Sequence, residues 1–320
     1  MLLVLCTKID TMEKTKIAIL GLGGVGGFYG GKLAKRYADS SHVEVYFIAR
    51  GAHLNVIREN GIRVISDEGE FTAKPNLATD RPSEIGVMDY IVLTTKSYDL
   101  TNSIELIKPC IGEKTVILPL LNGGDITERI RSILPESTVW SGCSYIVSRK
   151  IEPGVIKSSG SYTKLVFGYD QGINEQTKWF ENLLKEADID VTLSPNIRES
   201  IWKKFFFISV TASLTSYFNV GFNELVNTQE RLDTTAGMAE EFLKVAKAEG
   251  ISLDKNSAEE VVARSEALPT GATTSMHSDF KAGNRTEVET LTGVIVQLAH
   301  KHHIRVPIYE TVYNKLKKQF

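Results

Sequence analysis

Lys16-Ile-Ala-Ile-Leu20-Gly21-Leu-Gly23-Gly-Val-Gly26 is the most informative stretch of this 320-residue sequence. Its first five residues form a short apolar run that ends at a glycine, which is typical of a buried strand. Residues 28–37 then follow the pattern of a helix. The stretch therefore predicts a strand, a glycine-rich turn and a helix in direct succession.

The glycines of this turn match the GxGxxG pattern of dinucleotide-binding sites. Gly21 permits the tight turn, Gly23 lets the backbone approach a pyrophosphate, and Gly26 lets helix and strand pack closely. The helix N-terminus then favours the anion. A glycine-rich turn used only for packing is the alternative, but the position in the first strand–helix unit favours nucleotide binding. The predicted cofactor-binding residues of the turn are Gly21, Leu22, Gly23, Gly24, Val25 and Gly26.

The alternation of strand and helix continues beyond the turn. Further strands are predicted at 43–48, 89–94 and 115–120, and helices at 52–60, 99–109 and 125–133. Residues 62–71, interrupted by Asp67-Glu-Gly69, have the pattern of an appended hairpin. Such alternation predicts a Rossmann-like α/β fold, a doubly wound parallel sheet with helices on both faces.

The pattern changes in the second half of the chain. Residues 138–168 are β-rich, and a helix at 175–187 and a strand at 190–193 close the first domain. Beyond Ser194-Pro195-Asn196 the sequence is all-α, with helices predicted near 197–218, 235–249, 256–267, 286–303 and 307–319. We therefore expect an N-terminal extension (1–13), a Rossmann NADP-binding domain (14–195) and a helical substrate and catalytic domain (196–320).

Composition and charge exclude several classes of protein. The formal net charge of −2 gives no reason to expect binding to nucleic acid or to an anionic membrane. Leu2–Leu5 is too short for a signal peptide, whose apolar core needs about seven residues or more. No run approaches the roughly eighteen apolar residues of a membrane span. We expect a soluble, cytoplasmic protein, and the sequence leaves both Met1 and Met12 open as its natural start.

The metal-ligating residue types lack the spacing of a metal site. Cys6, Cys110 and Cys143 are odd in number and form no CxxC pair, which argues against disulfides and zinc and fits a reducing compartment. His277, His302 and His303 have no ligand spacing either, and we expect them to be surface or partner-bound histidines. The sequence predicts no metal.

Two basic residues indicate which nicotinamide cofactor is used. Arg50 ends the second predicted strand, where an NAD site has an acidic residue and where an arginine favours the 2′-phosphate of NADPH. Lys96 follows the strand at 89–94 and emerges at the same edge of the sheet. Either residue alone is explained as an ordinary surface cation. Together at strand ends, they predict NADP(H) as the cofactor.

As a whole, the chain resembles the ketopantoate reductase family (2-dehydropantoate 2-reductases), which are NADPH enzymes of pantothenate synthesis. The resemblance covers residues 16–320 and depends on the order and spacing of five motifs. They are Gly21–Gly26, Lys96 after its strand, Asn122-Gly123-Gly124, Asn196-Ile-Arg-Glu-Ser-Ile-Trp-Lys-Lys204, and Ser275-Met276 with Asp279 and Glu287.

The resemblance implies roles for four residues. Lys204 would protonate the carbonyl oxygen as hydride arrives, and Glu287 would hold the reacting groups and contact the cofactor. Asn122 would lie between cofactor and substrate, and Ser275 would bind the carboxylate end of the substrate. The residues alone leave other readings open: Glu287 as a helix-start carboxylate, Asn122 as a turn residue, and Ser275 as a helix cap.

The chemistry of the lysine can be argued without the resemblance. Asn196 and Glu199 are a plausible capping pair that starts a helix carrying Lys204 about two turns further on. A ketone that accepts hydride develops negative charge on oxygen, which a nearby ammonium stabilises. Lys203 points about 100° away on the helix, so only one of the two lysines can face the site. The residues alone do not choose between them, and the resemblance selects Lys204.

The substrate side departs from the family pattern. Family members have asparagines four and eight residues after the lysine, where this chain has Ile208 and Ala212. Phe222 stands in the register of a third asparagine, with Asn219 and Asn223 nearby. The pocket wall should therefore be more apolar than usual. Three hydroxyls are candidates to replace the missing amides, those of Ser209, Thr211 and Ser213.

The predicted function is NADPH-dependent reduction of a 2-oxo acid to a 2-hydroxy acid, with ketopantoate as the leading substrate. Three alternatives remain: a reductase of the same fold for a more apolar 2-oxo acid, a hydroxyacid or polyol-phosphate dehydrogenase, and a non-catalytic NADPH-binding sensor. The proposed acid and the nucleotide lie on different domains, so we expect domain closure. The sequence does not decide the oligomeric state and leaves a homodimer open.

Overall fold

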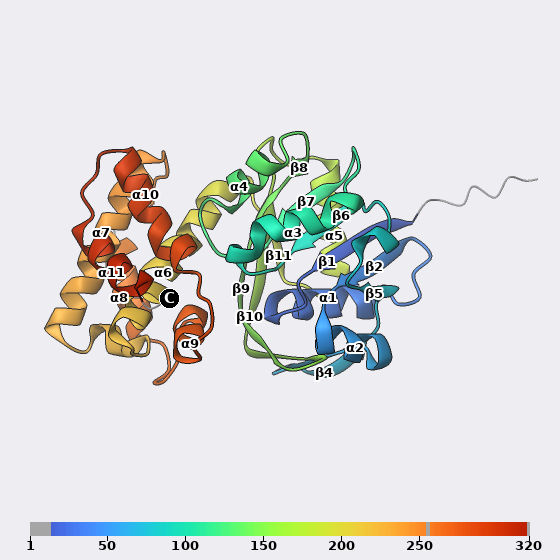
Figure 1. Cartoon of the computed structure of the whole chain (residues 1–320), viewed down its shortest axis with the longest axis horizontal. Coiled ribbons are helices and arrows are strands. Elements are labelled where there is room, and N and C mark those ends of the chain that lie inside the picture. Colours follow the sequence, from blue (N-terminus) through green and yellow to red (C-terminus); the bar gives the residue numbers. More distant parts are fainter. Residues whose placement is uncertain (1–13, 254–256, 319–320) are drawn as a thin grey trace, which may run out of the picture.

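A computed structural model of the chain describes residues 14–253 and 257–318. The predicted extension at 1–13 lies outside the described residues. The chain forms an N-terminal α/β part and a C-terminal helical part, and helix α6 (Ile197–Phe218) begins the second part beside the first (Figure 1). This is the fold class that the sequence predicts.

The central sheet of the α/β part is entirely parallel. Its strands, in spatial order, are β5 (Leu77–Thr79), β2 (Val43–Ile48), β1 (Thr15–Leu20), β6 (Tyr90–Leu93), β7 (Val116–Pro119) and β8 (Thr138–Val139). With the hairpin between β2 and β5 set aside, this is the 3-2-1-4-5-6 order of a dinucleotide-binding fold.

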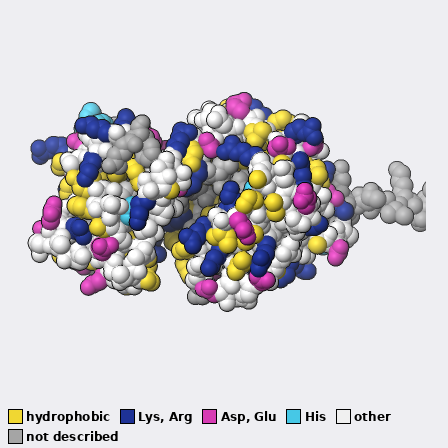
Figure 2. All heavy atoms as spheres, turned by 60° about the horizontal axis from the view of Figure 1, so that its bottom comes forward, with side chains coloured by type: hydrophobic (Ala, Val, Ile, Leu, Met, Phe, Trp, Pro, Cys, Tyr) yellow, Lys and Arg dark blue, Asp and Glu magenta, His cyan; other side chains and the backbone are white. Residues whose placement is uncertain are grey.

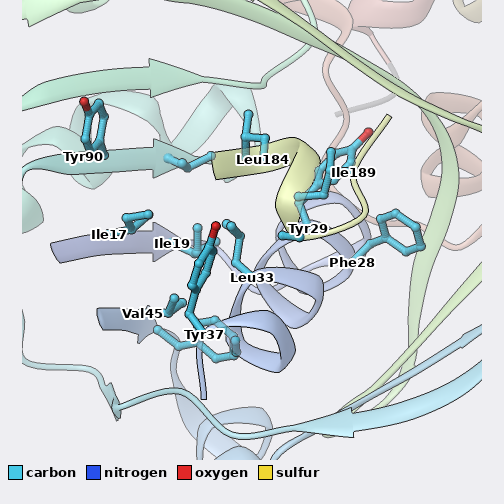
Figure 3. Packing of buried hydrophobic residues seen from close by; sticks show 14 of the residues in the cluster. Ile17, Ile19, Phe28, Tyr29, Leu33, Tyr37, Val45, Tyr90, Leu184 and Ile189 are labelled. Carbon is cyan, nitrogen blue, oxygen red and sulfur yellow. The ribbon is translucent and has the colours of Figure 1, made fainter. Parts of the chain in front are cut away.

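The helices of the α/β part fall where the sequence predicts them, with one shift. They are α1 (Gly24–Arg36), α2 (Gly51–Asn60), α3 (Leu100–Ile107), α4 (Ile126–Ile133) and α5 (Glu175–Glu186), with short 3₁₀ turns at η1 (Pro82–Glu84), η2 (Ser97–Asp99) and η3 (Lys108–Cys110). Helix α1 begins four residues earlier than predicted, inside the glycine-rich stretch. Figure 3 shows Leu33 of this helix beside Ile19 of β1, whereas Phe28 points away from that strand.

A second sheet lies on the other side of α1. It contains β3 (Ile62–Ser66), β4 (Gly69–Ala73), the long hairpin β9 (Ser141–Glu152) and β10 (Val155–Gly168), and β11 (Val191–Leu193). The predicted hairpin at 62–71 is therefore confirmed as β3 and β4. A Cβ added to Gly24 would lie 2.0 Å from the Ser148 carbonyl oxygen, and one added to Gly27 would lie 2.5 Å from Ile156. Both glycines let the second sheet approach α1 closely.

The helical part has its own buried core. Its elements are α6, η4 (Asn223–Val226), α7 (Gln229–Ala248), α8 (Ser257–Glu266), α9 (Ser275–Lys281), the π-helical turn η5 (Glu289–Gly293), α10 (Val294–Lys301) and α11 (Pro307–Lys317). Two predictions were wrong in detail. Helix α7 starts at Gln229 instead of 235, because Thr228 caps its first turn. Helix α9 was missed, because seven residues are too few to show helical periodicity.

None of the described helices is both long enough and apolar enough to cross a membrane.

Candidate active site

The parallel sheet brings the predicted cofactor residues to one edge. Leu20 pairs with Ile48 on β2 and with Leu93 on β6, and Leu93 pairs with Pro119 on β7. The residues that follow these strand ends therefore emerge together at the carboxyl edge, where open α/β sheets bind ligands. They are Gly21, Arg50, Lys96 and Asn122.

The glycine-rich turn has one open position and two tightly packed ones. Gly21 has a φ of +93°, which disfavours a side chain there. A Cβ on Gly26 would lie 2.1 Å from the Thr94 hydroxyl oxygen, so this glycine lets α1 pack against β6. A Cβ on Gly23 would meet no atom within 4 Å. The turn thus offers open backbone before the first turn of α1, which fits a pyrophosphate.

Leu22 and Val25, the other members of this turn, face inward. Leu22 is buried, and Val25 packs against the core of the α/β part. The Leu22 carbonyl oxygen accepts a hydrogen bond from His53 Nε2 at 2.7 Å, while the Gly154 N–H donates to His53 Nδ1 at 2.8 Å. No sequence pattern indicates a role for this histidine, which connects the nucleotide turn to α2 and to the β9–β10 turn.

The two neighbouring lysines of α6 point in different directions. Asn196 caps the helix, since its side chain accepts the Glu199 N–H, as predicted. Lys203 is exposed and pairs with Glu199 at 2.7 Å. Lys204 is half-buried, and its Nζ donates to the Asn122 Oδ1 at 2.8 Å. The tertiary structure therefore distinguishes the two lysines and places Lys204 beside Asn122.

The environment of Lys204 makes its charged form less favourable than it is in water. Burial lowers the pKa of the Lys204 ammonium, and this effect outweighs the opposite influence of the Cys143 thiol and the Glu287 carboxylate. A depressed pKa makes an ammonium a better proton donor near neutral pH.

Glu287 lies in a buried polar group with Lys96. Only 4% of Glu287 is exposed, and its Oε1 accepts the Ser97 N–H at 3.1 Å. Its Oε2 lies 3.7 Å from the Lys96 Nζ, which also donates to Asp279 Oδ2 at 2.8 Å. Burial acts against the Lys96 ammonium, but the carboxylates of Glu287 and Asp279 prevail and raise its pKa. The pKa of Lys96 is therefore shifted in the opposite direction from that of Lys204.

Two buried hydroxyls near Glu287 are unpaired. The Ser97 Oγ and the Thr286 Oγ1 have no hydrogen-bond partner among the described residues. Together with the open face at Gly23, these groups fit a polar ligand that spans the edge of the sheet.

Two predicted site residues lie apart from this cluster. Arg50 follows β2 as the N-cap residue of α2, with 90% of its side chain exposed, and its Nη2 lies 3.8 Å from Asp99 Oδ2. Ser275 is the exposed first residue of α9, and the cap of that helix is the preceding Thr274. Ser275 stands four residues before Asp279, so both lie on one face of α9. On that face, Asp279 accepts a hydrogen bond from Lys96.

The three hydroxyls considered as substitutes for the missing asparagines do not serve that role. Ser209, Thr211 and Ser213 are fully buried. Ser209 bonds the Leu291 carbonyl and the Tyr309 hydroxyl, Thr211 bonds the Phe207 carbonyl, and Ser213 bonds the Thr292 hydroxyl. The sequence prediction was wrong here, because these residues face the helical core instead of the site.

The nearby asparagines are also engaged elsewhere. Asn219 has a φ of +56° at the end of α6, and its Oδ1 lies 2.8 Å from His277 Nε2. Asn223 donates to the Thr270 hydroxyl. We expected His277 to lie at the surface or to be bound to a partner side chain. It is hydrogen-bonded to Asn219, and it is buried and not at the surface.

An aromatic side chain that the sequence analysis missed lies beside the lysine. The ring centroid of Tyr145, on β9, is 5.9 Å from the Lys204 Nζ. Burial raises the pKa of Tyr145 to about 12, so it stays a neutral phenol. The alternation of side chains along a strand does not predict which residue contacts a helix from another part of the chain.

The space-filling view (Figure 2) shows the surface of the molecule between its two parts. The surface is hollowed between the helical part and the α/β part, and lysine and arginine side chains stand along both walls (Figure 2). Among the described residues, no three His, Cys, Asp or Glu side chains come together as metal ligands would.

Comparisons with known proteins agree with this geometry. Residues 17–172 match the family described as "Ketopantoate reductase PanE/ApbA", and residues 196–319 match its C-terminal domain. The chain is similar to a 2-dehydropantoate 2-reductase of Halobacterium salinarum, 27% identical over 93% of this chain and 96% of that protein.

Solved structures give the same result. A 2-dehydropantoate 2-reductase from Porphyromonas gingivalis W83 is 36% identical, with a TM-score of 0.84 over 95% of this chain and 99% of that one. A D-mandelate dehydrogenase solved with NADH and anilino(oxo)acetate is 27% identical, with a TM-score of 0.81 over 95% and 98%. The chain belongs to the ketopantoate reductase PanE/ApbA family in both its N- and C-terminal domains, and is an NAD(P)-dependent oxidoreductase that acts on a 2-oxo acid.

Proposed function

We propose that this protein reduces a 2-oxo acid to the 2-hydroxy acid with NADPH, and that its leading substrate is ketopantoate, which it converts to pantoate. The observation that supports this best is the half-buried Lys204 ammonium, which has a lowered pKa and donates to Asn122 at 2.8 Å. We further propose that residues 14–195 hold the cofactor and residues 196–320 supply the catalytic and substrate-binding groups.

In this proposal Lys204 is the general acid. The bound cofactor supplies the hydride, and the substrate oxygen becomes negatively charged as its carbon is reduced. The Lys204 ammonium stabilises that charge and transfers a proton to the oxygen, which leaves a neutral amine. The lowered pKa of Lys204 makes this transfer easier than from a solvated lysine.

The other predicted residues orient the reacting groups. Asn122 holds the lysine through its carbonyl oxygen. Glu287 fixes the backbone after β6 through the Ser97 N–H and contributes negative charge near Lys96 and Lys204. Ser275, on the face of α9 that also carries Asp279, binds the substrate carboxylate. Arg50 binds the 2′-phosphate, which the shape and charge of its guanidinium suit.

One observation favours a second candidate substrate, a more apolar 2-oxo acid. Ile208 lies one turn beyond Lys204, and Phe207 stacks on Phe222 with ring centroids 6.1 Å apart. The guanidinium of Arg264 lies 4.2 Å above the Phe207 ring. This wall offers aliphatic and aromatic surface where the family has amides. The likeness to a D-mandelate dehydrogenase supports the same candidate, because that protein binds an aryl-substituted oxo acid.

The test is NADPH oxidation followed at 340 nm with ketopantoate, 2-oxoisovalerate, 4-methyl-2-oxopentanoate and phenylglyoxylate. Wild type and Lys204→Ala are compared, with Lys203→Ala as the matched control. We expect turnover with NADPH that Lys204→Ala reduces by at least about a hundredfold in kcat.

The panel separates the two candidates. Fastest turnover of ketopantoate supports the leading substrate, and fastest turnover of the branched or aryl acids supports the second. Tight NADPH binding without turnover of any 2-oxo acid would contradict the proposed reaction.

A further inference from the structure

The Asp99 carboxylate lies between two guanidinium groups from different parts of the chain. Arg50 Nη2, at the end of β2, is 3.8 Å from Asp99 Oδ2. Arg285 Nη1, from the segment between α9 and η5, is 3.9 Å from Asp99 Oδ1. The two arginines thus approach the same carboxylate from the α/β part and from the helical part.

This arrangement is loose and open to solvent. The side chains of Arg50 and Arg285 are 90% and 66% exposed, and that of Asp99 is 33% exposed. Exposed ion pairs of this length contribute little to the stability of a protein. An incoming ligand with more negative charge can therefore replace the carboxylate as the partner of both arginines at small cost.

Arg285 is nevertheless held in place. Its guanidinium carbon lies 4.4 Å from the ring centroid of Tyr98, within the range of a cation–π contact. Tyr98 and Asp99 belong to η2, directly after the strand end that carries Lys96. Arg285 is thus positioned over the carboxyl edge of the sheet, although it comes from a distant segment.

We propose that Arg285 is a second ligand for the 2′-phosphate of the cofactor, together with Arg50. This inference rests on the proposed use of NADPH. A phosphate monoester carries about −1.5 to −2 charge near pH 7 and three acceptor oxygens, against one negative charge on Asp99. Two planar guanidinium groups can each bind it through paired hydrogen bonds.

Asp99 then has a defined part in cofactor selection. The Asp99 carboxylate keeps the two arginines near each other in the cofactor-free protein. When both arginines bind the 2′-phosphate instead, the negative charge of Asp99 repels that phosphate. Because Arg285 belongs to the helical part, the 2′-phosphate connects the two parts of the molecule. Glu287 follows Arg285 by two residues, so the contact between Arg285 and the 2′-phosphate also brings the segment that carries Glu287 toward the cofactor.

The test is a binding measurement that needs no turnover. Isothermal titration calorimetry with 2′,5′-ADP and with 5′-AMP isolates the 2′-phosphate, because the two probes differ only at that group. Wild type is compared with Arg50→Gln, Arg285→Gln and Asp99→Asn. Arg63→Gln is the control for lost surface charge, since Arg63 is a half-exposed arginine paired with Glu70 on the β3–β4 hairpin.

We expect Arg285→Gln to weaken 2′,5′-ADP binding about tenfold and 5′-AMP binding less than about twofold, the pattern also expected of Arg50→Gln. Asp99→Asn should strengthen 2′,5′-ADP binding a few-fold, and Arg63→Gln should change neither Kd.

Two results would overturn the inference in distinguishable ways. If wild type prefers 2′,5′-ADP but Arg285→Gln binds it normally, or loses both probes equally, Arg285 is not a phosphate ligand while NADPH use stands. If wild type does not distinguish the probes, the proposed use of NADPH fails, and this inference fails with it.

Discussion

The Lys204 Nζ donates a hydrogen bond of 2.8 Å to the Asn122 Oδ1. An ammonium has only donors, so the amide must turn its carbonyl oxygen toward the lysine. The Asn122 Nδ2 group therefore points elsewhere and keeps both of its protons for another acceptor. One contact between α6 and the loop after β7 thus fixes the Lys204 ammonium, which is the proton donor in our proposal, beside an amide group that the proposal makes available to the substrate.

Replacing the lysine should separate activity from stability. Lys204→Met removes the proposed general acid, so kcat should fall at least about a hundredfold. It also removes an ammonium whose charge is disfavoured by burial, so the variant should be more stable near neutral pH. A rise in Tm of about 2–4 °C would correspond to about 1 kcal/mol. Differential scanning fluorimetry and steady-state kinetics measure both effects.

The neighbouring lysine is the control for that experiment. Lys203→Met changes an exposed lysine on the same helix turn and should leave kcat within about twofold of wild type. Equal loss of activity in the two variants would contradict the assignment of Lys204.

The rate of reduction should fall at alkaline pH. Only the protonated Lys204 can act as acid, and its pKa lies below the ordinary 10.5. As pH rises through this lowered pKa, log kcat/KM for reduction should fall with a slope near −1. The reverse oxidation, which needs the neutral amine, should rise over the same range. A reduction rate that stays level to pH 10.5 would show that Lys204 is not the donor.

Stability should change with pH in the corresponding sense. Below the lowered pKa, Lys204 is protonated in the folded and unfolded states, and the cost of burying its charge is fully present. As pH rises through that pKa the folded state loses the proton first, so the cost is relieved, completely so above 10.5. The Tm advantage of Lys204→Met should therefore be largest at neutral pH and shrink toward pH 10.

Two adjacent glycines should respond differently to alanine. A Cβ on Gly23 meets no atom within 4 Å, so Gly23→Ala should fold with an unchanged Tm but occupy the space that the pyrophosphate approaches. We expect its Kd for NADPH, measured by cofactor fluorescence, to rise at least about tenfold. A variant that binds NADPH normally would contradict the placement of the pyrophosphate.

Gly24→Ala should instead lower stability. Its Cβ would lie 2.0 Å from the Ser148 carbonyl oxygen, which is backbone and cannot move away cheaply. A loss of about 1–3 kcal/mol is expected for overpacking of this kind, which circular dichroism melting would detect. An unchanged Tm would mean that β9 does not hold the second sheet against α1.

The apolar wall should control the choice of substrate. Ile208→Asn places an amide one turn beyond Lys204, on the same helix face. We expect kcat/KM to rise several-fold for ketopantoate, which has a hydroxyl to bond, and to fall for 4-methyl-2-oxopentanoate. Ile208→Leu is the size control and should leave the ratio of the two values unchanged. The same shift in both variants would mean that polarity at this position does not set specificity.

Much of the α/β part was predictable because its signals are local. A buried strand, a GxGxxG turn and a helix follow one another within residues 16–36, and each is recognised from neighbouring residues alone. Parallel strands then require Gly21, Arg50, Lys96 and Asn122 to share one edge, whatever the rest of the chain does. The cap at Asn196, which sets where α6 starts, is also a local signal.

Contacts between distant segments needed the tertiary structure. Lys203 and Lys204 are equivalent as residues of a helix, and only the approach of the loop after β7 brings Asn122 to Lys204. Ser209, Thr211 and Ser213 look like pocket residues until α6 packs against η5 and α11, which buries their hydroxyls. The same limit applies to Arg285, which reaches Asp99 across 186 residues of sequence.

The sequence by itself thus determined the doubly wound fold, the nucleotide turn and the polar residues at the edge of the sheet, because strand, turn and cap signals arise within a few residues. The tertiary structure decided which lysine faces the site, which hydroxyls are buried, and why α1 carries so many glycines. The second sheet explains these glycines, because β9 and β10 pack closely against one face of α1 while β1 packs against the other. Close packing of segments far apart in sequence leaves no local pattern, so only the folded chain shows it.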